Sequence, residues 1–187
     1  MNIAAQIIGI IVVPIMMMAY QQKTQQRIVI FQFVCSLLFA FHYLLLGAIG
    51  AFLVNSIGIV RAFVYARGSK DAWAAHPAWV AVFSALYILG YGVTLRFAYE
   101  SVTVPIALLE LLPVSAAILA NFAFRMRDAR RVRIISAFIS PQWLTYNMIK
   151  LSVGGIINEL LVFISIIIGI VRDVKSRDQK GNSGVEL

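Results

Sequence analysis

Four ionisable side chains lie inside long apolar stretches of the chain: His42, Arg61, Glu110 and Glu159. An ionisable group at the centre of a membrane-spanning helix costs about 2.5 to 3.5 kcal/mol, so such residues usually mark a solute or proton pathway. Glu110 and Glu159 are therefore candidates for solute binding or a proton relay. The alternative is that each carboxylic acid only joins two helices through a hydrogen bond.

The other two ionisable residues have similar alternatives. His42 can accept a proton or bind a solute, but it lies about four residues from the expected end of its helix, where a wet interface can satisfy it. If Arg61 faces a cavity, it favours anionic solutes. Otherwise its head group reaches the membrane interface along the helix surface.

Amide and aromatic side chains accompany these groups. At about 1.5 Å per residue, Asn55, Glu110 and Glu159 share one depth in the membrane. Together with the remaining candidates they form what we call the outer polar tier. Its other members are His42, Trp143, Asn147 and Asn158. The two repeat-related asparagines, Asn55 and Asn158, bind a ligand or join the helices.

Composition requires a membrane environment for these residues. Of 187 residues, 61% are hydrophobic and 13% are charged, against roughly 45–50% and about 25% in ordinary globular chains. Since a span needs about 20 apolar residues, the chain has room for six or seven spans and no separate soluble domain. The net charge of +8 does not indicate nucleic acid, because the basic residues fall between the apolar runs.

Seven apolar runs predict an all-α polytopic membrane protein. They cover residues 3–20, 28–46, 49–65, 78–95, 102–123, 134–149 and 152–171. The sixth run is the most polar, so we expect it to be kinked and to face protein or a cavity. Pro14, Pro113 and Pro141 lie near the middle of three helices and are predicted hinges, because each removes a backbone donor.

Basic residues predict the orientation. Thirteen of them follow the odd-numbered spans, against only Arg96 and Lys150 on the other side. The thirteen are Lys23, Arg27, Arg67, Lys70, Arg125, Arg127, Arg130, Arg131, Arg133, Arg172, Lys175, Arg177 and Lys180. The positive-inside rule therefore places the N-terminus in the periplasm and the C-terminus in the cytoplasm of a bacterial inner-membrane protein.

Self-comparison suggests an internal repeat. A shift of 103 residues pairs Tyr43 with Tyr146 and Asn55 with Asn158, and a shift of 99 pairs Pro14 with Pro113. We interpret this as two parallel three-helix repeats joined by a linker helix, a 3+1+3 arrangement. The repeats are expected in residues 1–70 and 99–172, the linker in 71–98 and a disordered cytoplasmic tail in 173–187. Coincidence in apolar sequence is the alternative.

The segments FHYLLLGA, LELLP and SVGGIINE resemble the YgjV-type bacterial inner-membrane proteins, related to the PQ-loop, SWEET and PnuC transporter group. The resemblance spans nearly the whole chain and implies two three-helix units around a central cavity. In one respect the chain departs from PQ-loop relatives: Pro14 is followed by Ile15, and the PQ dipeptide is Pro141 with Gln142. The resemblance therefore does not imply their sugar- or amino-acid-like site.

The leading hypothesis is a small-solute transporter that moves a polar metabolite by alternating access. A non-transporting membrane receptor or scaffold of the same fold is the alternative. No enzyme, metal site or cofactor is expected, because the sequence has no HExxH, GxSxG or Cys/His cluster. The expected partners are membrane lipids and a small polar solute, not nucleic acid, and a homo-oligomer is left open.

Overall fold

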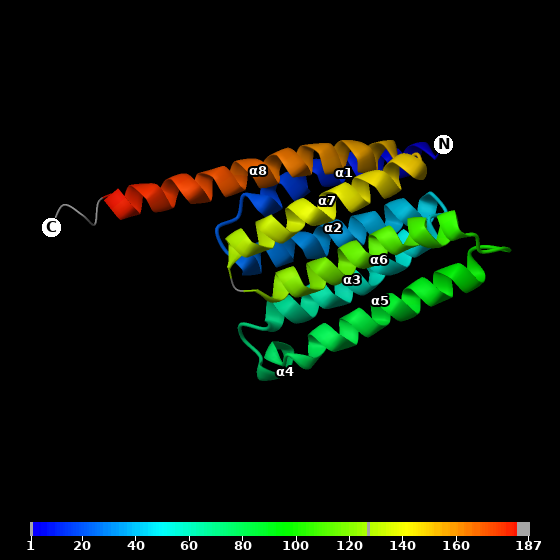
Figure 1. Cartoon of the computed structure of the whole chain (residues 1–187), viewed down its shortest axis with the longest axis horizontal. Coiled ribbons are helices and arrows are strands. Elements are labelled where there is room, and N and C mark those ends of the chain that lie inside the picture. Colours follow the sequence, from blue (N-terminus) through cyan, green and yellow to red (C-terminus); the bar gives the residue numbers. More distant parts are fainter. Residues whose placement is uncertain (1, 127, 183–187) are drawn as a thin grey trace.

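The computed structural model describes residues 2–126 and 128–182, and every regular element in them is a helix (Figure 1). Seven helices are long and one is short. They are α1 (Ile3–Tyr20), α2 (Gln25–Leu45), α3 (Ile49–Arg67), α4 (Ala72–Ala75), α5 (Ala78–Phe97), α6 (Val104–Arg125), α7 (Ala129–Ile149) and α8 (Val153–Asn182). Helices suit a membrane because each satisfies its own backbone hydrogen bonds.

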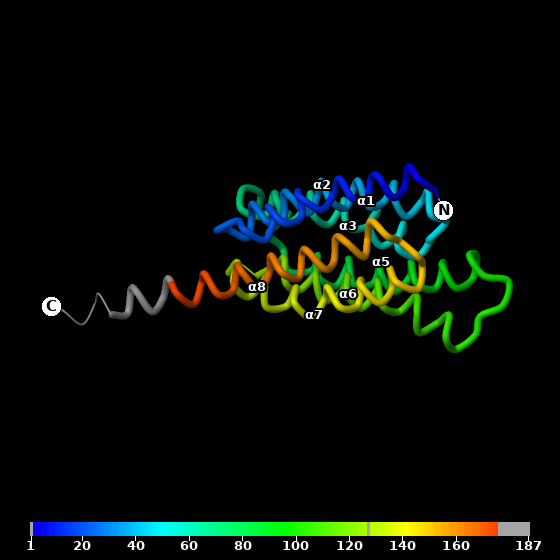
Figure 2. The backbone as a smooth tube through the Cα atoms, turned by 90° about the horizontal axis from the view of Figure 1, so that it is seen from above, coloured from blue at the N-terminus to red at the C-terminus, as the bar shows by residue number. Residues whose placement is uncertain are grey.

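Six of the seven long helices form two layers of three. In one layer α2 lies between α1 and α3, and in the other α7 lies between α6 and α8 (Figure 2). The layers meet along their edges, where α1 packs against α8 and α3 against α6. Since α2 and α7 touch only over a short stretch, the centre of the bundle is the place where a cavity can form. Helix α5 packs outside, against α3 and α6.

The bundle has two ends that the rest of the description uses. At the N-terminal end lie the N-terminus and the connections before α3, α6 and α8, and at the C-terminal end α8 runs out beyond the other helices (Figure 1). Gly47 and Leu151 form the tight turns before α3 and α8. They have positive φ angles of 70° and 53°.

The outer surface of the bundle is apolar. Six helices are long and apolar enough to cross a membrane, and α7, with 21 residues, is as long as these but less apolar. Its polar residues Arg133, Ser136 and Asn147 are buried, whereas Phe138 and Met148 are exposed. A helix that buries its polar face and exposes its apolar face matches a lipid surround, which explains the low hydropathy of the sixth predicted run.

The C-terminal segment differs from its predicted disorder. Helix α8 continues to Asn182, so residues 173–182 are helical, and residues 183–187 of the predicted tail lie outside the described residues. The physical reason is local: the segment from Arg172 to Lys180 contains neither Gly nor Pro, and most of its residues lose little free energy in a helix. The short helix α4 was also not predicted.

Candidate functional site

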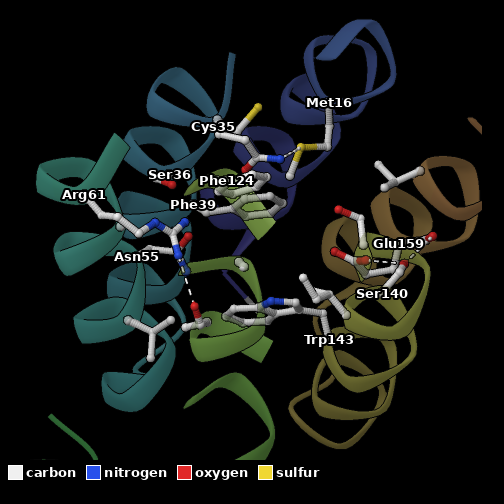
Figure 3. A pocket seen from close by; sticks show the side chains of 18 of the residues that line it. Met16, Cys35, Ser36, Phe39, Asn55, Arg61, Phe124, Ser140, Trp143 and Glu159 are labelled. Carbon is white, nitrogen blue, oxygen red and sulfur yellow. Dashed lines mark hydrogen bonds between the residues drawn. The ribbon is translucent and has the colours of Figure 1, made fainter. Parts of the chain in front are cut away.

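A cavity lies at the centre of the bundle, between the two layers (Figure 3). The volume of the cavity is about 70 Å³. Its polar lining consists of side chains from six long helices, α1, α2, α3, α5, α7 and α8. They are Tyr20, Gln32, Ser36, Tyr43, Asn55, Arg61, Tyr87, Ser136, Ser140 and Glu159. Such a lining inside a membrane protein is costly unless water or a solute occupies it.

Arg61 provides the positive charge of the cavity. Its side chain is only 4% exposed and extends from α3 towards α6, where Nη1 donates to the carbonyl oxygen of Ala117 at 3.1 Å (Figure 3). Its guanidinium carbon lies 5.0 Å from the ring centre of Phe124 and 5.8 Å from that of Tyr87. Among the described residues it has no acidic partner within ion-pair distance and no acceptor for Nε.

Glu159 lies across the cavity from Arg61, on α8 (Figure 3). Its Oε2 accepts a hydrogen bond from the Ser140 hydroxyl at 2.6 Å, and its Oε1 accepts one from the Asn158 amide at 3.1 Å. Both side-chain oxygens of Glu159 accept a hydrogen bond in this arrangement. The cavity therefore has a cationic wall on α3 and an acidic wall on α8.

Aromatic rings cover the cavity on the side of the N-terminal end. Tyr43 stacks on Trp143 with 5.7 Å between ring centres, and Tyr146 meets both rings edge-on. The Tyr43 hydroxyl donates to the Asn147 Oδ1 at 2.8 Å, which joins α2 to α7. Tyr43 and Trp143 thus form the wall of the cavity towards the N-terminal end.

Above this cover, an ionic cluster links α6 to the turn after α7. Lys150 Nζ lies 2.9 Å from Glu110 Oε1, and the Tyr99 hydroxyl donates to the same oxygen at 2.6 Å. Lys150 also donates to the Tyr99 oxygen at 2.8 Å. We call Glu110, Lys150 and Tyr99 the ionic cluster.

Two members of the ionic cluster lie outside the helices that span the bundle, and their pKa values shift. Partial burial opposes the charge of Lys150, but its hydrogen bonds to Tyr99 and Glu110 and the charge of Glu110 outweigh this, so the pKa of the ammonium is raised. Burial and the hydrogen bond to Glu110 raise the pKa of the Tyr99 hydroxyl. The ammonium stays charged and the phenol stays protonated over the physiological range.

On the side of the C-terminal end, Phe124 separates the cavity from a second hollow. Phe124 lines both spaces and is 2% exposed. The second hollow lies among the ends of α3 and α6, the start of α2 and the short helix α4. Nearby, the buried Arg133 donates to the Tyr20 carbonyl oxygen at 2.7 Å and pairs with Asp173, which ties α7 to α1 and α8.

The residues of the predicted tier are thus divided. Asn55, Trp143 and Glu159 line the cavity, as does Arg61. Glu110 faces the ionic cluster instead, and His42 is fully buried between the Ala5 carbonyl oxygen at 2.6 Å and the Ser152 hydroxyl at 2.8 Å. Asn147 and Asn158 are buried in hydrogen bonds beside the cavity rather than lining it.

The predicted hinges lie within unbroken helices. Pro14 is inside α1, Pro113 inside α6 and Pro141 inside α7. The Thr145 hydroxyl donates to the Pro141 carbonyl oxygen at 2.9 Å, so this exposed threonine has a hydrogen-bond acceptor on its own helix. The role of the three prolines as hinges stays a prediction.

Sequence reasoning did not single out several residues of this region, among them Tyr87, Ser36 and Lys150. Tyr87 and Ser36 line the cavity, but a lone tyrosine or serine in an apolar helix gives no signal of its own. Lys150 was assigned to a connection, where a basic residue is unremarkable. Ser36 does have one sequence signal, since Ser140 on the other side of the cavity follows it by 104 residues.

The apolar helices and the central polar cavity define the class of the molecule as a polytopic α-helical membrane protein. A model of the Imp-YgjV family, described as a bacterial inner membrane protein, matches residues 3–177. The chain therefore belongs to this family and is an integral protein of the bacterial inner membrane. No curated protein and no solved structure matches it. The wider relation to PQ-loop, SWEET and PnuC proteins stays a prediction.

Proposed function

We propose that the chain is a small-solute transporter whose central cavity opens alternately to the two sides of the inner membrane. The proposal rests on one observation. Arg61 and Glu159 lie on opposite walls of the same cavity, and they form no ion pair with each other. Two helices joined only for stability would need neither the space nor the separated charges. Ionisable side chains are costly inside a membrane, and a functional role explains why Arg61 and Glu159 are both present there.

An internal repeat supports the proposal. Equivalent features of the two halves recur 104 residues apart: α2 begins at Gln25 and α7 at Ala129, and the positive φ angles occur at Gly47 and Leu151. The turn bond from the Ala48 nitrogen to the Tyr43 oxygen has its counterpart in that from Ser152 to Asn147. In the proposed repeat this spacing pairs Tyr43 with Asn147, whereas the spacing of 103 expected from sequence pairs Tyr43 with Tyr146.

The same spacing relates residues that line the cavity. Ser36 corresponds to Ser140, Phe39 to Trp143, and Asn55 to Glu159. The edge contacts fit the same relation, because α1 against α8 corresponds to α6 against α3. A cavity on the axis between two parallel repeats is the arrangement from which rocking of one half against the other exposes a solute site to either side.

Alternating access also needs all seven long helices to cross the membrane. We take α7 as the seventh span, because its polar side is covered by α6 and α8 and its exposed side is apolar. In this proposal the N-terminal end lies outside and the C-terminal end in the cytoplasm, as the positive-inside rule predicts from the basic connections. In this orientation the ionic cluster and the aromatic cover close the periplasmic route, and Phe124 closes the cytoplasmic one.

Counterflow in proteoliposomes tests the proposal. Purified protein is reconstituted with one small polar solute inside, and entry of the same labelled solute is followed for a panel of metabolites. We expect exchange of at least one solute, with loss of exchange in Glu159→Gln and retention in Glu100→Gln, which removes the same charge from an exposed connection. No exchange of any solute, or equal exchange by both variants, would contradict the proposal.

A non-transporting receptor or scaffold is the second candidate. It is favoured by the ionic cluster and by His42 and Asn147, whose hydrogen bonds join neighbouring helices. The two candidates differ in the accessibility of the cavity. In a scaffold the cavity stays closed to both sides, whereas a transporter exposes it.

A further inference from the structure

We propose that the cavity binds a small zwitterion of the amino-acid type, with its carboxylate at Arg61 and its ammonium directed towards Glu159. This inference rests on the proposed function and names the class of solute. It is drawn from the unpartnered donors on one wall, the acceptors on the other, and the size of the space between them.

The cationic wall has donors without acceptors. Nε of Arg61 and the hydroxyl of Tyr87 make no hydrogen bond with any described residue, although the two side chains are only 4% and 1% exposed. Buried donors without acceptors are costly. Because the two groups are neighbours, with the guanidinium over the Tyr87 ring, one planar carboxylate can accept from both, as guanidinium groups commonly bind carboxylates.

The acidic wall complements the other end of such a solute. Glu159 has only neutral partners, Ser140 and Asn158, whereas Asn55 lies with Arg61 on α3. An anion alone would satisfy Arg61 but leave Glu159 without a counter-charge. A solute that carries both charges neutralises both walls, which lowers the cost of holding either charge in the membrane.

The volume of the cavity limits the size of the solute. About 70 Å³ is less than the roughly 150 Å³ of a cavity that binds a benzene ring, so the solute must be small. Glycine, β-alanine and γ-aminobutyrate have five to seven non-hydrogen atoms and differ mainly in the separation of their charges. They are therefore suitable probes of the distance between the walls.

Binding is measured as the solute-dependent rise in the unfolding temperature of the purified full-length protein, with counterflow as a second readout. The probes are these three zwitterions, with acetate, ethanolamine and glycerol as solutes that lack one or both charges. We expect at least one zwitterion to stabilise the protein and to exchange, and the other solutes to do so at least about tenfold more weakly, since each lacks at least one charge-assisted contact.

Variants assign the contacts. Arg61→Gln is expected to weaken zwitterion binding about tenfold or more, with Arg96→Gln, the same change at an exposed arginine, as its matched control. Tyr87→Phe removes only a hydroxyl that has no partner in the structure, so it should keep the fold and still weaken binding. This variant keeps the test decisive if Arg61→Gln fails to fold.

The outcomes separate the two proposals. If acetate or ethanolamine binds and exchanges as well as the zwitterions, the solute class is wrong and transport stands. If the zwitterions bind but Tyr87→Phe and a folded Arg61→Gln bind them as the unmodified protein does, the assigned contacts are wrong. If a solute outside the panel exchanges and no zwitterion binds, the inference is overturned while the proposed function holds.

Discussion

At the scale of single residues, the ionic cluster has a different role from the cavity. Glu110 is 1% exposed and Lys150 is 22% exposed at the side chain, so the pair is largely shielded from water. On α6, Glu110 lies on the same helix face as the cavity-lining Ala117, about 10 Å closer to the N-terminal end. It therefore lies between the cavity and that end of the bundle, and not in the cavity.

The first prediction concerns this pair. Glu110→Gln leaves the Lys150 ammonium without its carboxylate and should destabilise the protein by about 3 kcal/mol, because a shielded charge without a partner is costly. Lys150→Met alone should have a similar effect. The double variant should lose less than the two single losses added together, since neither charge remains. The unfolding temperature of the purified protein in detergent is the measurement, and additive losses would contradict the pairing.

The raised pKa of Lys150 gives a pH prediction. A basic group with a raised pKa in the folded state stabilises that state at all pH values below its ordinary pKa, about 10.4, and loses this effect as the pH rises through the higher folded value. The difference in unfolding temperature between the unmodified protein and Lys150→Met should thus stay constant from pH 7 to about 10 and shrink only above that range. A difference that shrinks near pH 8 would contradict the arrangement of the ionic cluster.

At the scale of helices, the packing of α1 against α8 depends on two glycines. A β-carbon on Gly154 would lie 2.9 Å from the Gly9 α-carbon and from the Gln6 carbonyl oxygen. Both are backbone atoms, so they can move away only if the helices separate. The Gln6 side chain adds to this contact by accepting from the Gly154 nitrogen at 2.9 Å.

We therefore predict that Gly154→Ala destabilises the protein by about 2 kcal/mol, in the range of overpacked cores. The matched control is Gly92→Ala in α5, where nothing lies within 4 Å of the added carbon. That change should be neutral or stabilising by up to about 1 kcal/mol, because alanine favours a helix over glycine. Both are measured by thermal unfolding in detergent. Equal effects of the two changes would mean that α1 and α8 are not in close contact.

At the scale of the whole molecule, the sequence predicts where the helices lie along the chain better than it predicts which helices contact each other. The apolar runs predict all seven long helices, because hydrophobicity is a local property of the chain. Which residues of the outer polar tier line the cavity is not determined by local sequence. It depends on which face of each helix meets which neighbour, and the shared depth of Glu110 and Glu159 does not contain that information.

Particular residues show what was missing. Glu110 and Glu159 look alike in sequence, yet one meets Lys150 and the other the cavity, because α6 and α8 present them to different neighbours. The low hydropathy of α7 identifies a helix with a protected polar face, but only packing shows that Ser136 and Ser140 face the cavity while Asn147 meets Tyr43. In the proposed repeat a spacing of 104 residues pairs Tyr43 with Asn147, whereas a shift of 103 in the sequence pairs it with Tyr146.

The central claim is that the cavity opens to both sides of the membrane, and the protein carries a natural reporter of this. Cys35, its one cysteine, is buried and lines the cavity. A membrane-impermeant thiol reagent is applied to spheroplasts, where it reaches the periplasmic side, and to inverted vesicles, where it reaches the cytoplasmic side. The control is Val12→Cys in a Cys35→Ala background, since Val12 is equally buried but does not line the cavity. We predict that Cys35 reacts from both sides and that the control reacts from neither. Protection of Cys35 from both sides, or its reaction from one side only, would contradict alternating access.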